Sequence, residues 1–172
     1  TNKYTIYASS QNIHVMRDTV ASMLNVDRNS VRFKAFDVGG GFGSKNFCYP
    51  GYALIAWAAK KVDRPVRWIA TRSELFISDH QARDHNSVSR LAIADDGKFI
   101  ALEINSVANL GAYMVGSSGG VQVVQYANLP GTVYKIPSIC LNISAAFTNK
   151  TPTGVFRGPG YAETNLILER LI

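Results

Sequence analysis

The stretch Val31-Arg32-Phe33-Lys34-Ala35-Phe36-Asp37-Val38-Gly39-Gly40-Gly41-Phe42-Gly43-Ser44-Lys45 joins an alternating segment to a run of glycines. Apolar and basic residues alternate at its start, which predicts a strand over 31–36 with one buried face. The glycines that follow lack a Cβ, so their backbone can adopt positive φ and approach a ligand closely. The stretch therefore predicts a strand that runs directly into a functional or tightly packed loop.

We call residues 39–45 the glycine loop. Consecutive backbone N–H groups in such a loop can bind an anion, and Lys45 adds a positive charge at its edge. Neither common phosphate motif is met, because Ser44 stands where the dinucleotide fingerprint needs glycine and precedes the lysine of a Walker pattern. A phosphate site and a packed turn are equal interpretations of the glycines alone. Phe42 fits either the wall of a pocket for a flat ligand or a core anchor.

The remaining sequence predicts alternating strands and helices. Strands are expected at 4–8, 66–70 and 139–147, with a hairpin of 88–93 and 99–109 around Asp95-Asp96-Gly97. Helices are expected at 11–24, 51–61 and 73–77, and from about residue 162 with Leu166, Ile167 and Ile172 buried. The glycine-rich segment 111–130 is expected to be irregular. This order predicts an α+β fold with a mixed sheet and helices, as a single domain over 1–172 that we expect to be a fragment of a longer subunit.

The composition excludes several classes of protein. With 172 residues, 47% of them hydrophobic and 17% charged, the chain is globular. No apolar run is long enough to span a membrane. The net charge of +6 is spread along the chain without interleaved aromatic residues, so no nucleic-acid partner is expected. Cys48 and Cys140 lack metal-type spacing, and a cytoplasmic location with reduced thiols is the simplest interpretation, with a disulfide between them as the less favoured alternative.

No catalytic constellation appears in the sequence itself. The three histidines are scattered, no His/Cys/Asp/Glu cluster has metal-ligand spacing, and no nucleophile elbow is present. Any chemistry must then come from a bound cofactor. Two further positions are candidates for holding one: Arg157, in the tight turn Phe156-Arg157-Gly158-Pro159-Gly160, and Gln11, after the first strand. A guanidinium can bind an oxyanion through two parallel bonds, although an arginine that caps carbonyls is commoner.

Taken together, these segments resemble the xanthine dehydrogenase and aldehyde oxidase family of molybdenum hydroxylases. The closest likeness is to the molybdopterin-binding large subunit of the carbon monoxide dehydrogenase-like branch, and it covers essentially the whole chain. The matching segments are Ser9-Ser10-Gln11-Asn12, residues 38–45, Arg64-Pro65-Val66-Arg67-Trp68, Tyr134-Lys135-Ile136-Pro137, Thr148-Asn149-Lys150 and Val155-Phe156-Arg157-Gly158.

The resemblance implies a cofactor and a reaction. The cofactor is molybdenum on molybdopterin, expected in its cytosine dinucleotide form and bound without a metal ligand from a protein side chain. The residues that match its contacts are Gln11, Gly40, Gly41, Phe42, Gly43, Arg157 and Gly158. The implied reaction is hydroxylation of an electrophilic carbon with water as oxygen source, and the electrons leave to iron–sulfur and FAD-containing partner subunits. The family's general base, a glutamate, is expected beyond Ile172, so these 172 residues alone are expected to be inactive.

Three positions match the substrate pocket of the family. The chain has Asn46, Gln125 and Pro159 where purine-oxidising members carry a glutamate, an arginine and a phenylalanine, so the resemblance disfavours xanthine. Gly158 stands where carbon monoxide dehydrogenases proper carry a copper-bridging cysteine. An aldehyde or another N-heterocycle is the expected substrate. The alternatives are a non-catalytic nucleotide- or phosphate-binding module, which rests on the glycine loop alone, and a purely structural domain.

Overall fold

The computed structural model describes residues 3–128 and 130–172. Contacts between residues divide the chain into two compact units, Thr1–Asp79 and His80–Ile172, which we call unit 1 and unit 2. Each unit has its own hydrophobic cluster. We expected one domain over 1–172, and since a division by contacts does not establish separate folding, that expectation stays a prediction.

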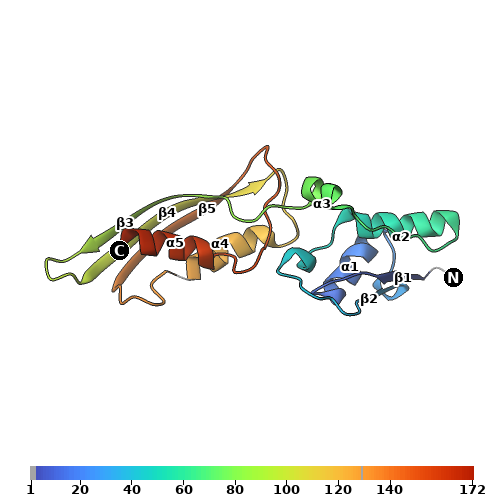
Figure 1. Ribbon diagram of the computed structural model, residues 1–172, viewed down its shortest axis with the longest axis horizontal. Helices are drawn as coiled ribbons and strands as arrows, with labels where there is room; N and C mark the ends of the chain where they lie inside the picture. Colours follow the sequence, from blue (N-terminus) through green and yellow to red (C-terminus); the bar gives the residue numbers. More distant parts are fainter. Residues whose placement is uncertain (1–2, 129) are drawn as a thin grey trace. The chain divides into compact units, whose positions relative to one another are not determined.

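Unit 1 is a short parallel sheet with helices beside it (Figure 1). Strands β1 (Tyr4–Tyr7) and β2 (Val31–Lys34) pair in parallel. The core lies where Val20 and Ala21 of helix α1 (Ile13–Met23) meet Val31 of β2. The other elements are the short helices η1 (Arg28–Ser30) and η2 (Ser44–Asn46) and the α-helices α2 (Pro50–Val62) and α3 (Arg72–Ser78).

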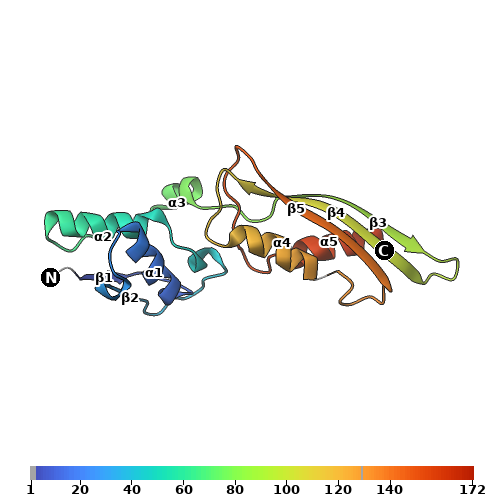
Figure 2. The same ribbon diagram turned by 180° about the vertical axis from the view of Figure 1, so that it is seen from behind.

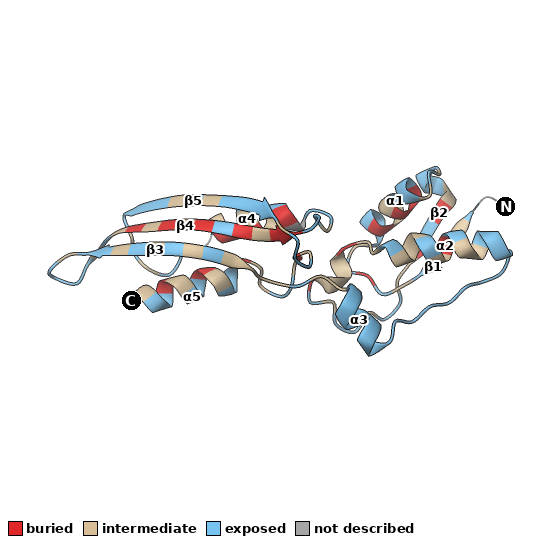
Figure 3. Ribbon diagram, turned by 90° about the horizontal axis from the view of Figure 1, so that it is seen from above, coloured by how far each residue is buried: buried red, intermediate tan, exposed pale blue. Residues whose placement is uncertain are grey.

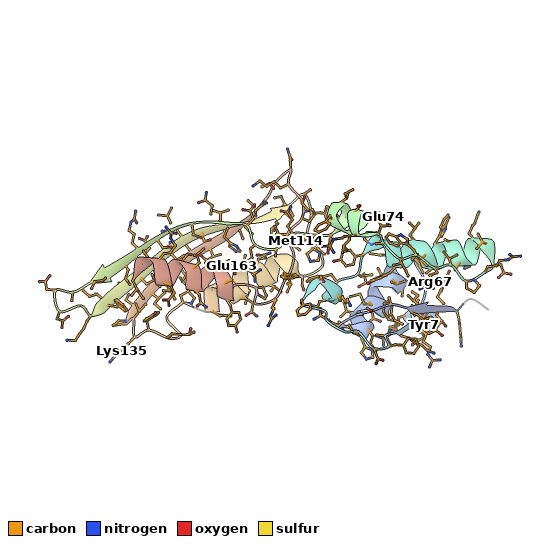
Figure 4. The ribbon with its side chains drawn as sticks, in the orientation of Figure 1. Tyr7, Arg67, Glu74, Met114, Lys135 and Glu163 are labelled. Atoms are coloured by element: carbon orange, nitrogen blue, oxygen red, sulfur yellow. The ribbon has the colours of Figure 1, made fainter. Side chains whose placement is uncertain are left out.

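The helix starts of unit 1 follow local chemistry. The Asn12 side chain caps α1 by accepting from the Val15 N–H. The helix therefore begins at Ile13, two residues after the predicted start at Gln11. Pro50 occupies the first turn of α2, as expected. Helix α3 begins one residue earlier than predicted, because Thr71 and Glu74 form a capping box. Figure 4 labels Glu74 on this helix.

The predicted strand at 66–70 is wrong. The structure assigns no strand to these residues, and they pair with neither β1 nor β2. Trp68 instead lies against α2, where a Cβ on Gly51 would come within 3.3 Å of its ring. The strand-forming residues of this segment thus make no ladder of backbone hydrogen bonds, and Trp68 contacts a helix.

Unit 2 is a three-stranded mixed sheet with two helices on one face (Figure 2). Strands β3 (His85–Ile93) and β4 (Phe99–Gly111) form the predicted antiparallel hairpin. Strand β5 (Ser138–Phe147) joins β4 in parallel, which needs a crossover connection. Helix α4 (Ser118–Asn128) lies in that crossover, and helix α5 (Tyr161–Leu171) follows the sheet. The predicted α+β fold with a mixed sheet is confirmed.

The two faces of β4 differ in polarity. Leu102, Ile104 and Ala108 alternate along the buried face, which Figure 3 shows in red on the central strand. On the opposite face Glu103 accepts hydrogen bonds from Arg90 and Asn105. A sheet with one packed and one wet face gives this alternation, and it fixes the register of the hairpin.

The segment 111–130, predicted to be irregular, contains helix α4. Gly119 and Gly120 lower its intrinsic helix propensity. Gln122 and Tyr126, four residues apart, are nevertheless both fully buried against the sheet. Tertiary packing of this face therefore overrides the glycines, as it does for most helices in proteins.

The predicted buried face of the last helix is partly wrong. Thr164 and Leu168 of α5 are buried, whereas Leu166 is 61% and Ile172 is 54% exposed. Ile167 packs at the edge of the core. A polar residue such as Thr164 is not expected in the interior. It is accommodated there because its hydroxyl donates to the carbonyl of Tyr126.

The two cysteines lie in different units, and both are free thiols. Burial raises the pKa of the Cys48 thiol to about 11. The thiolate is the reactive form, so we expect Cys48 to resist alkylation at neutral pH in the folded protein and to react after unfolding. Mass spectrometry after iodoacetamide treatment measures this. Rapid labelling of native Cys48 would contradict its buried position.

Candidate cofactor-binding site

The glycine loop is closed onto Gln11 by two hydrogen bonds. The Gly43 N–H donates to the Gln11 side-chain oxygen over 2.9 Å, and the Gln11 N–H donates to the Lys45 carbonyl over the same distance. Phe42 and Gly43 both have positive φ, of 52° and 98°. With its oxygen held by Gly43, the amide group of Gln11 presents its NH2 end as a donor on the opposite side.

Gly41 is the position at which the loop approaches Gln11 most closely. A Cβ added there would lie 2.5 Å from the Gln11 side-chain oxygen, a distance that real atoms do not reach. The absence of a side chain at Gly41 is therefore what allows Gln11 to take this position. The glycines predicted a close approach of the loop backbone to another group, and in the structure that group is the Gln11 side chain.

Phe42 is not a core anchor. Its side chain is 55% exposed, and its ring lies over Gly40, where a Cβ would come within 2.8 Å of the ring. The exposed ring fits the other interpretation of Phe42, in which it forms a wall against a flat ligand.

Lys45, predicted to add a positive charge at the loop edge, is bound to the loop itself. Its ammonium donates to the Val38 carbonyl over 2.9 Å and so ties the two ends of the loop together. The Tyr49 hydroxyl lies 3.0 Å from the Ser44 carbonyl and 2.5 Å from the Asp79 carboxylate. Burial, then the bond with Asp79, raises the pKa of Tyr49 and keeps it protonated. The lysine that favoured a phosphate site therefore has a structural role in this loop.

The turn of residues 156–160, here called the Arg157 turn, is built in unit 2. Gly158 and Gly160 both have positive φ, of 69° and 81°. A Cβ on Gly160 would lie 2.7 Å from the Tyr126 nitrogen and 2.8 Å from the Gln125 carbonyl carbon. The turn therefore lies directly against the backbone of α4, which requires a glycine at this position.

The predicted substrate-pocket residues fall in both units. Asn46 lies in η2, where its N–H donates to the Gly43 carbonyl, so it directly borders the glycine loop. Gln125 of α4 borders the Arg157 turn, which also contains Pro159. The structure thus joins Gln11 with Gly41 and Gly43 in unit 1, and Gln125 with the Arg157 turn in unit 2.

Sequence reasoning weighed Glu163 only as a poor alternative general base, and it missed the pairing of Glu163 with Arg83. Arg83 precedes β3 and donates to three carbonyls of the Arg157 turn, more than 70 positions later in the chain. Its Nε lies 3.5 Å from the carboxylate of Glu163, which Figure 4 labels on α5. Both residues border an open hollow of about 660 Å³ with His85, Ser89 and Ile167. No local sequence pattern could have indicated a contact over this separation.

His85 is stacked on Tyr126, with ring centroids 4.9 Å apart. Burial lowers the pKa of His85, and the nearby Glu163 carboxylate only partly offsets this. The unfolded chain therefore binds a proton near pH 6.5 that the folded chain does not, so stability is complete above that pH and declines as the pH falls through it.

We expect the unfolding temperature to fall as the pH drops below 6.5 and to fall less steeply in the His85→Gln variant. Thermal denaturation followed by circular dichroism over this pH range measures both slopes. Equal slopes in the two proteins would show that His85 does not carry the effect.

Two features are absent from the described part of the chain. Residues 3–128 and 130–172 contain no group of three or more His, Cys, Asp or Glu side chains that could hold a metal ion. Within the same ranges, no helix has the length and apolar character needed to cross a membrane.

Comparison with known proteins identifies the class of this chain. The model of the molybdopterin cofactor-binding domain matches residues 1–172. The chain belongs to this family, whose members are molybdenum-dependent oxidoreductases.

Three relatives show the extent of the likeness. The carbon monoxide dehydrogenase large chain of Hydrogenophaga pseudoflava is 32% identical over 98% of this chain and 21% of its own. The 6-hydroxypseudooxynicotine dehydrogenase complex subunit gamma of Paenarthrobacter nicotinovorans is 32% identical over 92% of this chain and 20% of its own. The solved quinoline 2-oxidoreductase of Pseudomonas putida is 29% identical and superimposes with a TM-score of 0.82, over 98% of this chain and 23% of its own. The chain thus spans about a fifth of the length of the curated relatives it matches.

Proposed function

We propose that this chain is part of a molybdenum hydroxylase that oxidises an aldehyde or an N-heterocycle with water as the oxygen source. The observation that carries the proposal is the orientation of Gln11. Its side-chain oxygen accepts from Gly43 and lies beside the bare backbone of Gly41, so its NH2 group is left as a donor on the opposite side of the amide. A donor held in this way suits an anionic ligand atom of a cofactor.

Unit 1 and unit 2 each carry residues that are proposed to contact the molybdopterin. Gln11 donates a hydrogen bond, the exposed Phe42 ring shields the cofactor from water, and Gly40, Gly41 and Gly43 permit close backbone contact. Arg157 and Gly158 bind a polar edge of the cofactor. The cofactor, when bound, supplies the oxidising chemistry, and these residues bind and orient it.

Asn46, Gln125 and Pro159 are proposed as substrate-pocket residues. None of them carries a charge, so they suit a neutral aldehyde or heterocycle better than an anionic substrate. Glu163 is not proposed as the general base, because its carboxylate is paired with Arg83. In the proposed substrate pocket, the amide of Gln125 provides a hydrogen-bonding group. The ring of Pro159 provides an apolar wall.

The cytosine dinucleotide form of the cofactor and partner subunits with iron–sulfur clusters and FAD complete the proposal, together with a cytoplasmic location. A relative that is named as the gamma subunit of a dehydrogenase complex supports the idea of partner subunits. The charge pattern gives no reason to add a nucleic-acid or membrane partner.

Isotopically labelled water tests the reaction class. We expect the purified intact enzyme to transfer the labelled oxygen from water into the product of an aldehyde or of an aromatic N-heterocycle such as quinoline. Label that enters the product from dioxygen and not from water, or oxidation of neither substrate class, would contradict the proposed function.

A further inference from the structure

One guanidinium connects the two sides of the Arg157 turn. The Arg83 Nη2 lies 3.3 Å from the carbonyl oxygens of both Phe156 and Gly158, and it donates at closer range to that of Arg157. The Arg83 Nε lies 3.5 Å from the Glu163 carboxylate, in the first turn of α5. The planar guanidinium thus binds the backbone of the turn with one edge and the helix that leaves the turn with another.

The Arg83–Glu163 ion pair is partly shielded from solvent. The Glu163 side chain is only 9% exposed and that of Arg83 is 31% exposed. Both Glu163 oxygens are shielded from solvent and make no hydrogen bond within the described part of the chain. A buried carboxylate without a partner is costly, so Arg83 is the cation that offsets its charge at this site.

The backbone of Arg83 is itself in an unfavourable conformation. Its φ is +55°, in the left-handed region that glycine adopts without cost and arginine does not. Such a conformation persists only where surrounding contacts determine it, and it is found preferentially at functional sites. Here the contacts are those that Arg83 makes with the turn and with Glu163.

We infer that Arg83 and Glu163 are positioning residues that hold the Arg157 turn in the conformation that binds the molybdopterin. This inference rests on the proposed function, because it assigns the purpose of the turn to cofactor binding. The pair touches neither cofactor nor substrate in this account. It acts through the three carbonyls, whose fixed directions set the backbone of Arg157 and Gly158.

The test compares Arg83→Met, Arg83→Lys and Glu163→Gln in the intact enzyme. The matched control is Arg90→Met, which removes an exposed Arg–Glu pair on β3 in the same unit. Hydrogen exchange of residues 156–161 measures the turn, and released molybdopterin per chain measures cofactor retention. We expect exchange about tenfold faster in Arg83→Met and molybdopterin retention lower by about tenfold or more, with partial rescue in Arg83→Lys and little change in Arg90→Met.

Three other outcomes would each contradict a specific part of the inference. Unchanged exchange in both Arg83→Met and Glu163→Gln would show that the pair does not hold the turn. Faster exchange with full molybdopterin retention would show that the turn is held but not for cofactor binding. A lack of molybdopterin in the unsubstituted enzyme would overturn the proposed function, while the exchange measurement would still decide whether the pair fixes the turn.

Discussion

Replacing Gly41 with alanine is expected to lower the molybdopterin bound per chain by about tenfold or more, because an orienting hydrogen bond next to the cofactor is lost. The new Cβ would lie 2.5 Å from the Gln11 side-chain oxygen, so the glutamine has to move away. Its bond to the Gly43 N–H then breaks, and its NH2 donor turns out of place. Molybdenum analysis and pterin fluorescence of the purified variant measure the loss.

Gly39→Ala is the matched control in the same loop. Gly39 has a positive φ, of 68°, and a Cβ there would meet no atom within 4 Å. Gly39→Ala should therefore strain the backbone of the glycine loop without displacing Gln11. If both variants retain the cofactor and only lose stability, the glycine loop is a structural turn and the role assigned to Gln11 is wrong.

Replacing Gly160 with alanine is expected to destabilise unit 2 by roughly 2–4 kcal/mol, the sum of left-handed strain and overpacking. The alanine would keep a φ of 81° and would press on the Tyr126 nitrogen at 2.7 Å. That neighbour is helix backbone and cannot rotate aside. Equilibrium denaturation of the variant, compared with the unsubstituted protein, measures the change in the free energy of unfolding.

Gly158→Ala is the control for the strain component. Its φ is 69°, and the nearest atom to its Cβ would be the Tyr161 Cβ at an ordinary 3.8 Å. We expect it to cost only about 1–2 kcal/mol, the price of left-handed backbone alone. Equal destabilisation by the two substitutions would contradict the close contact between the Arg157 turn and α4.

The fold was predictable where the pattern of side chains alone decides the element. The strands β1, β2 and β5 and the β3–β4 hairpin were predicted from local sequence: strand-forming residues in β1, alternation in β2 and the turn Asp95-Asp96-Gly97 in the hairpin. Helix α4 was missed, because its stability comes from burying Gln122 and Tyr126 and not from its own propensities. The segment 66–70 has strand-like composition but lacks a partner strand, which no local pattern reveals.

The candidate site was predictable only in part for a similar reason. Glycines at close approaches are visible in a sequence, so the glycine loop and the Arg157 turn were found. What the glycines approach is not visible: Gln11 and Gly43 are 32 positions apart, and Arg83 lies more than 70 positions before its carbonyl partners. The bond of Lys45 to the Val38 carbonyl was not predictable for the same reason, since that carbonyl is placed by the closed form of the loop.

The central claim is that this chain binds molybdopterin through Gln11 and the glycine loop. Its most direct test is the amount of molybdenum and of pterin in the purified, intact enzyme, measured beside the Gln11→Ala variant. The account predicts both in equal amounts in the unsubstituted enzyme, and a clear loss of both in the variant without a large change in unfolding temperature. Absence of molybdenum and pterin from the matured enzyme, or equal loading of the two proteins, would contradict it.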